Sequence, residues 1–439
     1  MKKDKFTGVC IGIIIFMGCV LMLVGKSKEI FITKGILQTE TSSEQGTTNI
    51  NWEKIYPFGA SINTSSTKSA QGTFNKKDNV SQLEKYWKSW LYLWNKVNNL
   101  GQTWEKNIPR YTSLLEIGGY TKRLLEVNAP LNAKSVVRAN NGYLYMINAK
   151  EDSAKYEKRT ESYSVFNEYL CDHGIPFVYI QVPVKVCKYD EEFQQEYQDY
   201  TNRNIDVMLA SLTDNQIDTI DLRDAIHKEG FDHNSLFFKT DHHWTIAAGL
   251  WAADEIANEI NKNYGILTNI QILDNRNFEK ITYKNAMFGS YGQTITHGWA
   301  DSEDFDIYLP NFDTSLNVCI PKLAMNTVGA FEDTMINWDK LNQSVSAKGG
   351  YAFESYLYGN QPITQITNNN YTDGPTVLMI RDSFSLSVAP YLALTVHRLD
   401  LIDVRKGNGN FNGSIIKYIE KLKPDIVLIL YSKMTELQL

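Results

Sequence analysis

Residues 237–257 read FFKTDHHWTIAAGLWAADEIA, and this stretch joins a polar loop to an apolar helical pattern. Apolar residues recur after the loop at helical spacings, which predicts one buried helix face made of Ile246, Leu250, Ala253, Ala257 and Ile260. Thr245 is the predicted N-cap of this helix, and Gly265 is its predicted end. We therefore expect a buried helix to give the loop rigid support.

The loop places a carboxylate and two imidazoles in adjacent positions, Asp241, His242 and His243. Successive side chains of an extended segment point to opposite faces, so Asp241 and His243 are expected to project together. A carboxylate beside an imidazole fixes its tautomer and stabilises the imidazolium, which is how a general base is built. The same residues also suit polar caps at a helix start, and this stretch alone leaves both interpretations open.

Composition limits the class of protein. The chain has 439 residues, of which 43% are hydrophobic, so one large α/β domain with an appendage would account for its length. The net charge is −6 and no long run of Lys or Arg occurs, which argues against nucleic acid as a partner. Three cysteines lie outside the N-terminal apolar run and lack metal-type spacing, so they predict neither a disulfide framework nor a zinc site: Cys171, Cys187 and Cys319.

An apolar stretch near the N-terminus predicts a membrane anchor. Residues 6–25 carry no charge, and at about 1.5 Å per residue they just span a bilayer core of roughly 30 Å. The preceding Lys2, Lys3 and Lys5 favour a cytoplasmic N-terminus. No A-x-A-like site follows, which favours an uncleaved anchor over a secretory signal peptide. We expect a single-pass protein of the cell membrane whose remaining residues are extracytoplasmic.

Changes in composition divide the chain into four expected parts. The first two are the cytoplasmic lysines and transmembrane anchor at 1–30 and a linker with an aromatic docking segment at 31–81. A helical membrane-proximal appendage is expected at 82–128, where leucines and tryptophans fall close to one helix face. The α/β domain is expected at 129–439, with an irregular insertion at about 286–370 that is rich in Gly, Asn and aromatic residues.

The 129–439 segment alternates short apolar runs with helical patterns. Strands are predicted at 176–184, 217–222, 376–381, 399–404 and 425–431. Short, continuously apolar strands that alternate with helices predict a parallel sheet with helices on both faces. Ligands of such sheets bind beyond the carboxyl ends of the strands. The Asp-His-His loop and the residues after Arg381 are expected at such ends or close to them.

A serine follows one of these strands. Arg381, Asp382, Ser383 and Phe384 close a predicted strand and open a helix. A serine at this place exposes its hydroxyl at the rim of the sheet, and neighbouring backbone N–H groups can stabilise an oxyanion. Serine is also a favoured N-cap, so the serine alone has two interpretations. Together with Asp241 and His243, it supplies a nucleophile, a base and a residue that orients the base.

The order of these motifs resembles a known family. TDHHW followed by a helix, and then a strand that ends in RDSF, resembles the DHHW proteins and the alginate acetylation proteins AlgJ and AlgX. These are SGNH-hydrolase-like enzymes with a flavodoxin-like parallel sheet, and in this branch the Asp-x-His motif precedes the serine, as it does here. The resemblance extends over roughly 50–439 and includes shorter motifs at 52–58, 136–146, 175–185, 287–293 and 356–362.

The resemblance implies a role for each site residue. Ser383 would be the nucleophile, His243 its general base and Asp241 the residue that orients the base. His242 and Trp244 would shape the loop. Four further residues are candidates for oxyanion or substrate binding: Gly289, Ser290, Asp382 and Arg381. Arg381 stands where many relatives have Gly before Asp-Ser, and Gly289 has the alternative of a loop position that requires a positive φ. No metal and no cofactor is implied.

The resemblance also implies a function. It is a membrane-anchored, extracytoplasmic O-acetyltransferase or acetylesterase that acts on cell-envelope or exported polysaccharide, with acetyl groups delivered by a membrane-bound O-acyltransferase of the MBOAT type. One alternative is a non-catalytic polysaccharide-binding or assembly subunit of an acetylation complex. Another is a metal-dependent phosphoesterase, because Asp-His-His also occurs in such enzymes. That alternative needs further strand-end aspartates, for which Asp221 and Asp382 are available, and it leaves Ser383 unexplained.

Overall fold

The computed structural model describes residues 116–117, 119–121, 136–267, 269–405, 411–437 and 439. The predicted anchor at 6–25, the linker at 31–81 and nearly all of the appendage at 82–128 lie outside these residues. Within the described part of the chain, every helix is too short or too polar to span a bilayer. The membrane anchor therefore stays a prediction.

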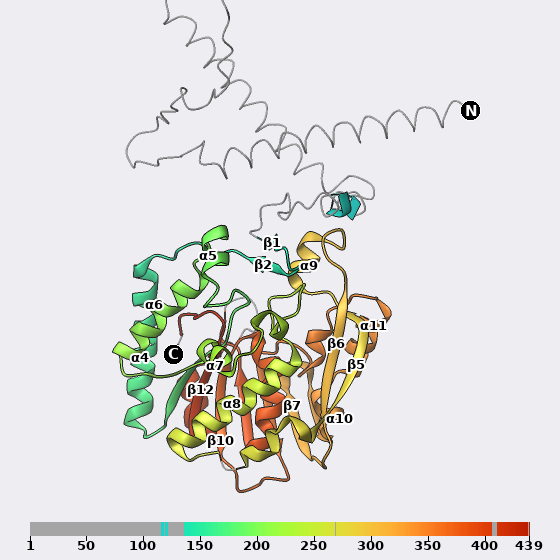
Figure 1. Cartoon of the computed structure of the whole chain (residues 1–439). Helices are drawn as coiled ribbons and strands as arrows, with labels where there is room; N and C mark the ends of the chain where they lie inside the picture. The colour runs from blue at the N-terminus through green and yellow to red at the C-terminus, as the bar shows by residue number, and fades with distance from the viewer. Residues whose placement is uncertain (1–115, 118, 122–135, 268, 406–410, 438) are drawn as a thin grey trace, which may run out of the picture. The chain divides into compact units, whose positions relative to one another are not determined.

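An eight-stranded sheet forms the centre of the fold (Figure 1). Its strands lie in the order β4-β3-β12-β10-β11-β9-β7-β8. Neighbours among the first five strands are parallel: β4 (Asp218–Asp221), β3 (Phe177–Gln181), β12 (Ile426–Tyr431), β10 (Thr376–Arg381) and β11 (Arg398–Ile402). The remaining pairings are antiparallel and involve β9 (Ile363–Asn368), β7 (Leu316–Ile320) and β8 (Met325–Gly329). The sheet is therefore mixed, and the prediction of an all-parallel sheet is correct only for its first part.

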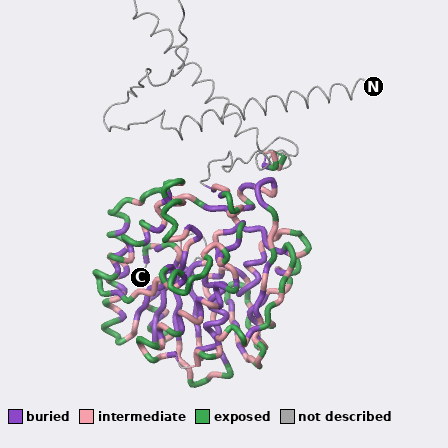
Figure 2. The backbone as a smooth tube through the Cα atoms, viewed as in Figure 1, coloured by how far each residue is buried: buried purple, intermediate pink, exposed green. Residues whose placement is uncertain are grey.

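Helices cover both faces of the sheet, as predicted. The alternating side chains of β12 show the two faces, because Val427 and Ile429 belong to one buried cluster while Ile426 and Leu428 belong to another. The first cluster includes residues of α4 (Ser153–Asp172), α6 (Thr201–Asp214) and α13 (Ile415–Leu422). The second includes residues of α7 (Leu222–Glu229), α8 (Ile246–Tyr264) and α12 (Ala389–Leu392). Figure 2 shows that burial concentrates along the central strands.

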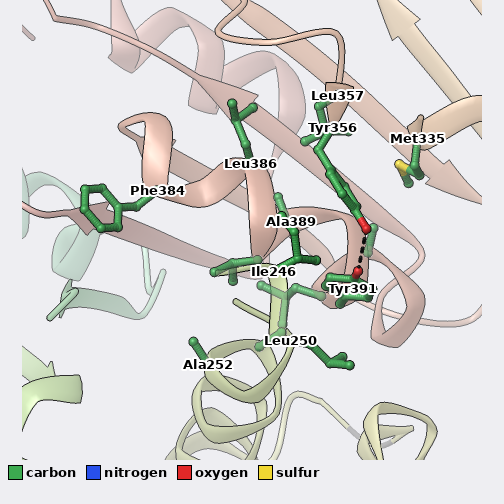
Figure 3. Close-up of a cluster of buried hydrophobic side chains, with 14 of the residues drawn as sticks. Ile246, Leu250, Ala252, Met335, Tyr356, Leu357, Phe384, Leu386, Ala389 and Tyr391 are labelled. Atoms are coloured by element: carbon green, nitrogen blue, oxygen red, sulfur yellow. Dashed lines mark hydrogen bonds between the residues drawn. The ribbon is translucent and has the colours of Figure 1, made fainter. Parts of the chain in front are cut away.

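Helix α8 agrees with its prediction at both ends. Thr245 Oγ1 accepts the N–H of Ala248 at 3.2 Å, and Gly265 ends the helix at φ +66°. The predicted apolar face is buried, and Figure 3 shows Ile246 and Leu250 beside Ala389 and Tyr391. α8 approaches the segment after β10 closely, since a Cβ on Gly249 would lie 2.4 Å from Ser387. The helix is thus fixed directly against the segment that carries Ser383.

The region at 286–370 is more regular than predicted. It contains β6 (Glu303–Pro310), which pairs with β5 (Phe278–Met287), and it supplies the three antiparallel strands of the main sheet. Its helices are α9 (Ser290–Ile295), α10 (Phe331–Met335) and α11 (Trp338–Ser346). β7 alternates buried and half-buried residues, whereas all six residues of β12 are buried.

The remaining elements are short. β1 (Val136–Arg138) and β2 (Leu144–Met146) pair in an antiparallel hairpin around Asn140–Gly142. Helix α5 (Glu191–Tyr197) precedes α6. Short 3₁₀ helices complete the described part: η2 (His233–Leu236), η3 (Ile270–Leu273), η4 (Asn275–Asn277), η5 (Pro321–Leu323), η6 (Ala352–Ser355), η7 (Ser383–Ser387) and η8 (Ala393–Thr395).

Candidate active site

The Asp-His-His loop is a tight bend rather than an extended segment. The backbone N–H of His243 donates to Asp241 Oδ1 at 2.9 Å, which closes an Asx turn. The N–H of Phe238 donates to the carbonyl of His243 at 3.2 Å and ties the end of the loop to its start. This turn brings the side chains of Asp241 and His243 together, so the predicted pairing is confirmed although the backbone conformation differs.

Ser383, His243 and Asp241 form one chain of hydrogen bonds. His243 Nε2 lies 2.7 Å from Ser383 Oγ, across 140 positions of sequence. His243 Nδ1 lies 2.5 Å from Asp241 Oδ1. Asp241 is fully buried and His243 is 2% exposed, whereas Ser383 is only half-buried. The predicted convergence of the three residues at the carboxyl end of a parallel strand is therefore confirmed.

Aromatic side chains hold the His243 ring in place. The ring stacks on Phe353 at a centroid distance of 4.1 Å and also contacts Phe384 at 4.8 Å. The hydroxyl of Tyr351 lies 3.1 Å from His243 Nδ1 and donates to Asp241 Oδ1 at 3.5 Å. Trp244 is buried, and its Nε1 donates to the carbonyl of Phe384 at 3.2 Å, which joins the loop to the segment of Ser383.

Asp241 is held as a carboxylate despite its burial. Burial alone would raise its pKa, but the imidazoles of His242 and His243 and the N–H of Ser290 together hold that pKa well below its usual range. The Ser290 N–H donates to Asp241 Oδ2 at 2.5 Å. The charge therefore persists at neutral pH and can stabilise a protonated His243.

His242 lies beside the reacting pair. Its ring centroid is 3.7 Å from that of His243, and its Nδ1 is 2.8 Å from Ser290 Oγ. The side chain is 35% exposed. Burial and the neighbouring His243 lower the pKa of His242, so the ring is neutral at pH 7. This position agrees with the predicted role of His242 in shaping the loop.

Gly289 and Ser290 do not have the oxyanion-binding role predicted for them. Their N–H groups donate to Thr240 Oγ1 at 2.8 Å and to Asp241 Oδ2, so both are already engaged inside the protein. The alternative of a positive φ at Gly289 is also wrong, because its φ is −74°. Gly289 is required for space instead: a Cβ there would lie 2.2 Å from the Cβ of Asp241. Both residues act as supports of the Asp241 carboxylate.

Arg381 and Asp382 also serve the fold and not the serine. The buried guanidinium of Arg381 donates to Asn360 Oδ1 and, at 3.0 Å, to the carbonyl of Gln361. Asp382 accepts the N–H of Phe384 at 2.9 Å and the N–H and hydroxyl of Ser432, each at 2.7 Å. These bonds fix the ends of β10 and β12. They correct the prediction that either side chain would contact an oxyanion or a substrate.

Arg405 follows β11. It donates to both oxygens of Asp403, at 2.9 and 2.8 Å, and is therefore a structural ion-pair partner.

Two residues that the sequence interpretation missed, Lys185 and Glu303, hold the backbone of the loop. Lys185 Nζ donates to the carbonyls of Lys239 and Asp241, each at 2.8 Å. Glu303 accepts the N–H groups of Lys239 and Thr240 at 2.7 and 2.8 Å and the Thr240 hydroxyl at 2.6 Å. Lys185 is 5% exposed, and burial lowers its pKa to about 7 although Glu303 and Asp241 oppose that shift. For Lys185, the available signal in the sequence is its position directly after the apolar run at 176–184.

Within the described residues, the potential metal ligands that lie close together all belong to this loop. Ligand atoms of Asp241, His242 and His243 lie within 4.8 Å of one another. The two aspartates considered for a metal site do not extend this group, because Asp221 is bound to Arg223 and Asp382 to backbone and Ser432. Both ring nitrogens of His243 are engaged by Asp241 and Ser383, so a metal would have to break the hydrogen-bonded chain.

Comparison with known proteins agrees with this geometry. Residues 136–297 match the protein family described as SGNH hydrolase-like domain, acetyltransferase AlgX. The predicted resemblance is confirmed. No curated protein matches the chain in sequence.

Three solved structures are similar to the chain and support the same fold. PatB1 of Bacillus cereus with a sulfonyl adduct is 18% identical with a TM-score of 0.55, and the match covers 68% of this chain and 93% of that one. A second structure of Bacillus cereus PatB1 is 19% identical with a TM-score of 0.55, and the match covers 67% of this chain and 94% of that one. A DHHW family protein from Eubacterium siraeum is 16% identical with a TM-score of 0.51, over 67% and 89%.

Proposed function

We propose that this chain is a serine O-acyltransferase or esterase of the SGNH type that uses Ser383, His243 and Asp241. The observation that carries the proposal is the hydrogen-bonded chain from Ser383 Oγ through His243 to a buried carboxylate, at 2.7 and 2.5 Å. The family match supports acyl transfer as the class of reaction. Ser383 is half-buried at the start of η7, and this position supports its role as the nucleophile.

The arrangement accounts for both halves of an acyl transfer. Ser383 Oγ attacks the carbonyl carbon of an acyl donor while its proton passes to His243 Nε2, and the resulting imidazolium is stabilised by Asp241. Collapse of the tetrahedral adduct releases the donor group, which takes the proton from His243 and leaves an acyl ester on Ser383. An acceptor hydroxyl then gives its proton to His243 and attacks the ester carbonyl. Collapse of this second adduct breaks the bond to Ser383 Oγ, which takes the proton back from His243 and restores the free serine. A sugar acceptor gives a transferase, and water gives an esterase.

The acceptor, location and partner form part of the proposal. The AlgX description of the matched family supports acetyl transfer to a polysaccharide of the cell envelope or an exported polysaccharide. The apolar run at 6–25 supports a single-pass anchor with the α/β domain outside the cell, which protease digestion of intact cells would check. A membrane-bound O-acyltransferase of the MBOAT type would then supply acetyl groups across the membrane.

Covalent labelling and turnover test the proposal together. A sulfonyl fluoride forms an ester with an activated serine hydroxyl, so mass spectrometry of the full-length chain should find the adduct at Ser383. The same protein should hydrolyse a chromogenic acetyl ester, and acetylated glycan in the presence of a candidate polysaccharide would identify a transferase. Ser383→Ala should abolish labelling and turnover, whereas Ser235→Ala, at an exposed serine of η2, should preserve both.

Two results would contradict the proposal. An active Ser383→Ala variant that loses its activity with a chelator would favour the metal-dependent phosphoesterase. A chain that binds polysaccharide but neither reacts with sulfonyl fluoride nor turns over any ester would favour the non-catalytic subunit.

A further inference from the structure

A pocket of about 260 Å³ lies beyond the carboxyl ends of three neighbouring parallel strands. Its lining includes residues 184–186 after β3, Phe384 after β10 and residues 432–434 after β12. The chain leaves β3 toward β4 on one side and β10 toward β11 on the other, so the strand order reverses at this point. Open α/β sheets bind their ligands at such a reversal, so we expect this pocket to bind one.

The pocket lies beside the reacting serine without enclosing it. His242 and Phe384 form part of its wall, and they are the sequence neighbours of His243 and Ser383. The rings of His242 and Phe384 lie 5.8 Å apart, and both contact the ring of His243. Ser383 is not one of the described residues that line the pocket. The pocket therefore suits the part of a ligand next to the reacting group, and not the reacting group itself.

One hydroxyl in the pocket has no partner. Tyr156 of α4 is 6% exposed, and its hydroxyl forms no hydrogen bond within the described part of the chain. The carboxylate of Glu151 in the same pocket is engaged at both oxygens, by Arg159 at 2.8 Å and by Lys433 at 2.9 Å. Burial of a hydroxyl without a hydrogen bond costs free energy, so a ligand that pairs with Tyr156 would remove this cost.

Two side-chain amides in the lining keep donors for a ligand. Asn148 Nδ2 donates to Thr201 Oγ1 at 2.9 Å, and Asn204 Nδ2 donates to the carbonyl of Ala149 at 3.0 Å. Each amide nitrogen carries two N–H groups, and one of the two has a partner among the described residues. Both residues are half-buried, so each amide is oriented by one bond and retains a second donor.

The remaining lining is largely aliphatic and comes from β2, α6 and the segments after β3 and β12: Met146, Val184, Val186, Ile205, Met208 and Met434. A sugar ring has C–H groups on its faces and hydroxyls at its edge, so it uses both kinds of lining. A purely aliphatic ligand would leave the Tyr156 hydroxyl unpaired, and a small anion would leave the aliphatic wall in contact with water. The lining therefore favours a sugar ring.

We propose that this pocket binds a sugar ring of the acceptor polysaccharide, next in the chain to the ring that is acetylated, and that the Tyr156 hydroxyl is hydrogen-bonded to it. This inference rests on the proposed acyl-transfer function. A pocket of about 260 Å³ is close to the lower end of ligand sites, which measure roughly 300–1,000 Å³, so it takes one ring. The shortest acceptor that occupies both this pocket and the position at Ser383 is a disaccharide.

The dependence of acetyl transfer on acceptor length tests the pocket. Polysaccharide extracted from cells that express the chain is freed of acetyl groups with mild base and cut by partial acid hydrolysis. The full-length chain then transfers acetyl from p-nitrophenyl acetate to the monosaccharide, disaccharide and tetrasaccharide fractions, and mass spectrometry measures the products. Because only the disaccharide and longer acceptors fill the pocket, kcat/KM should rise about tenfold from monosaccharide to disaccharide and change less beyond it.

Two substitutions alter the pocket. Tyr156→Phe removes the unpartnered hydroxyl, and Met146→Trp narrows the pocket at a residue that is 38% exposed. Each should raise KM for the disaccharide about three- to tenfold, and leave monosaccharide acetylation and the hydrolysis of p-nitrophenyl acetate within about twofold. The matched control is Tyr169→Phe, which removes a hydroxyl from the same helix outside the pocket lining and should change none of these values.

Thermal melts of the chain without any glycan check the Tyr156 hydroxyl separately. Tyr156→Phe should melt at the same temperature as the unaltered chain or higher, because the substitution removes a buried polar group and breaks no hydrogen bond of the protein. A clearly lower melting temperature would show that the hydroxyl has a structural partner, and would overturn its assignment to the sugar.

The outcomes separate this inference from the function on which it depends. A disaccharide no better than the monosaccharide, or an unchanged KM in both variants, would overturn the sugar site and leave acyl transfer intact. Hydrolysis of the ester that requires Ser383, with no acetylated glycan, would also overturn the sugar site and would identify an esterase. Without any Ser383-dependent turnover the proposed function fails, and calorimetric binding of the disaccharide that Tyr156→Phe weakens would still assign the pocket. The absence of both turnover and binding would overturn both proposals.

Discussion

The two parts of the central sheet contribute to the site in different ways. The parallel part, from β4 to β11, carries Ser383 at the end of β10 and the pocket at the ends of β3, β12 and β10. The antiparallel part and the β5–β6 hairpin come from 278–368 and carry no member of the Ser383–His243–Asp241 chain. The second region nevertheless provides Glu303, Tyr351 and Phe353, which contact the loop or the His243 ring.

This difference separates reaction from support. The parallel strands place chemical groups at one edge because their carboxyl ends coincide there. The antiparallel region then restrains those groups with backbone hydrogen bonds and ring contacts, and such restraint fixes the near-attack geometry on which the rate depends. Substitutions in the first region should remove the chemistry, and substitutions in the second should misplace it.

The largest effect is expected within the loop. Asp241→Asn should lower kcat by roughly 10⁴-fold, because an amide neither selects the required tautomer of His243 nor stabilises its protonated form. His242→Ala should lower kcat by less than about tenfold, because His242 packs beside the pair and is not part of the hydrogen-bonded chain. Steady-state kinetics with an acetyl ester measures both. Equal losses in the two variants would contradict the assignment of His243 alone as the base.

A smaller effect is expected where the two regions hold the loop together. Lys185→Met from the parallel side and Glu303→Gln from the hairpin should each lower kcat roughly 10- to 100-fold and leave KM within about twofold. The downfield proton resonance of the Asp241–His243 hydrogen bond should shift in both variants, and this readout does not depend on turnover. Lys188→Met is the control, since Lys188 binds Asp224 at 2.8 Å, away from the loop. An unchanged resonance in Lys185→Met would show that its bonds do not position Asp241.

Lys185 also predicts a dependence of stability on pH. Burial lowers its folded-state pKa to about 7, whereas an unfolded lysine has a pKa of about 10.4. Between these values the unfolded chain binds the extra proton, so Lys185 makes the free energy of unfolding increase as pH rises from about 7 to about 10. Thermal melts across this range should show that increase, and Lys185→Met should reduce it. A parallel response of the two proteins would contradict the lowered pKa.

The smallest effect is expected at Tyr351. Tyr351→Phe removes one hydroxyl that lies 3.1 Å from His243 Nδ1 and 3.5 Å from Asp241 Oδ1, while the buried ring stays in place. Because the Asp241–His243 hydrogen bond remains, kcat should fall only about two- to tenfold. The pH–rate profile should shift by a fraction of a pH unit, because the hydroxyl no longer donates to the carboxylate. A loss as large as that of Asp241→Asn would make Tyr351 part of the essential chain.

The sequence by itself determined the elements whose signals are local. The buried face of α8, its Thr245 cap and its Gly265 end follow from spacing and capping within one segment. The continuously apolar strands predicted parallel pairing with helices on both faces, and Ser383 follows the carboxyl end of one of them, β10. These features are decided by residues close in the chain, so they can be predicted without the fold.

Only the tertiary structure decided how the polar groups around the loop are used. The Gly289 and Ser290 N–H groups bind Thr240 and Asp241 instead of an oxyanion, and Arg381 turns to Asn360 and Gln361. The region at 286–370 contains strands of the main sheet because β9 pairs with β7 on one side and with β11 on the other, and neither partner is its neighbour in sequence. A hydrogen-bonding group shows its type in the sequence, but its partner depends on which distant segment the fold places beside it.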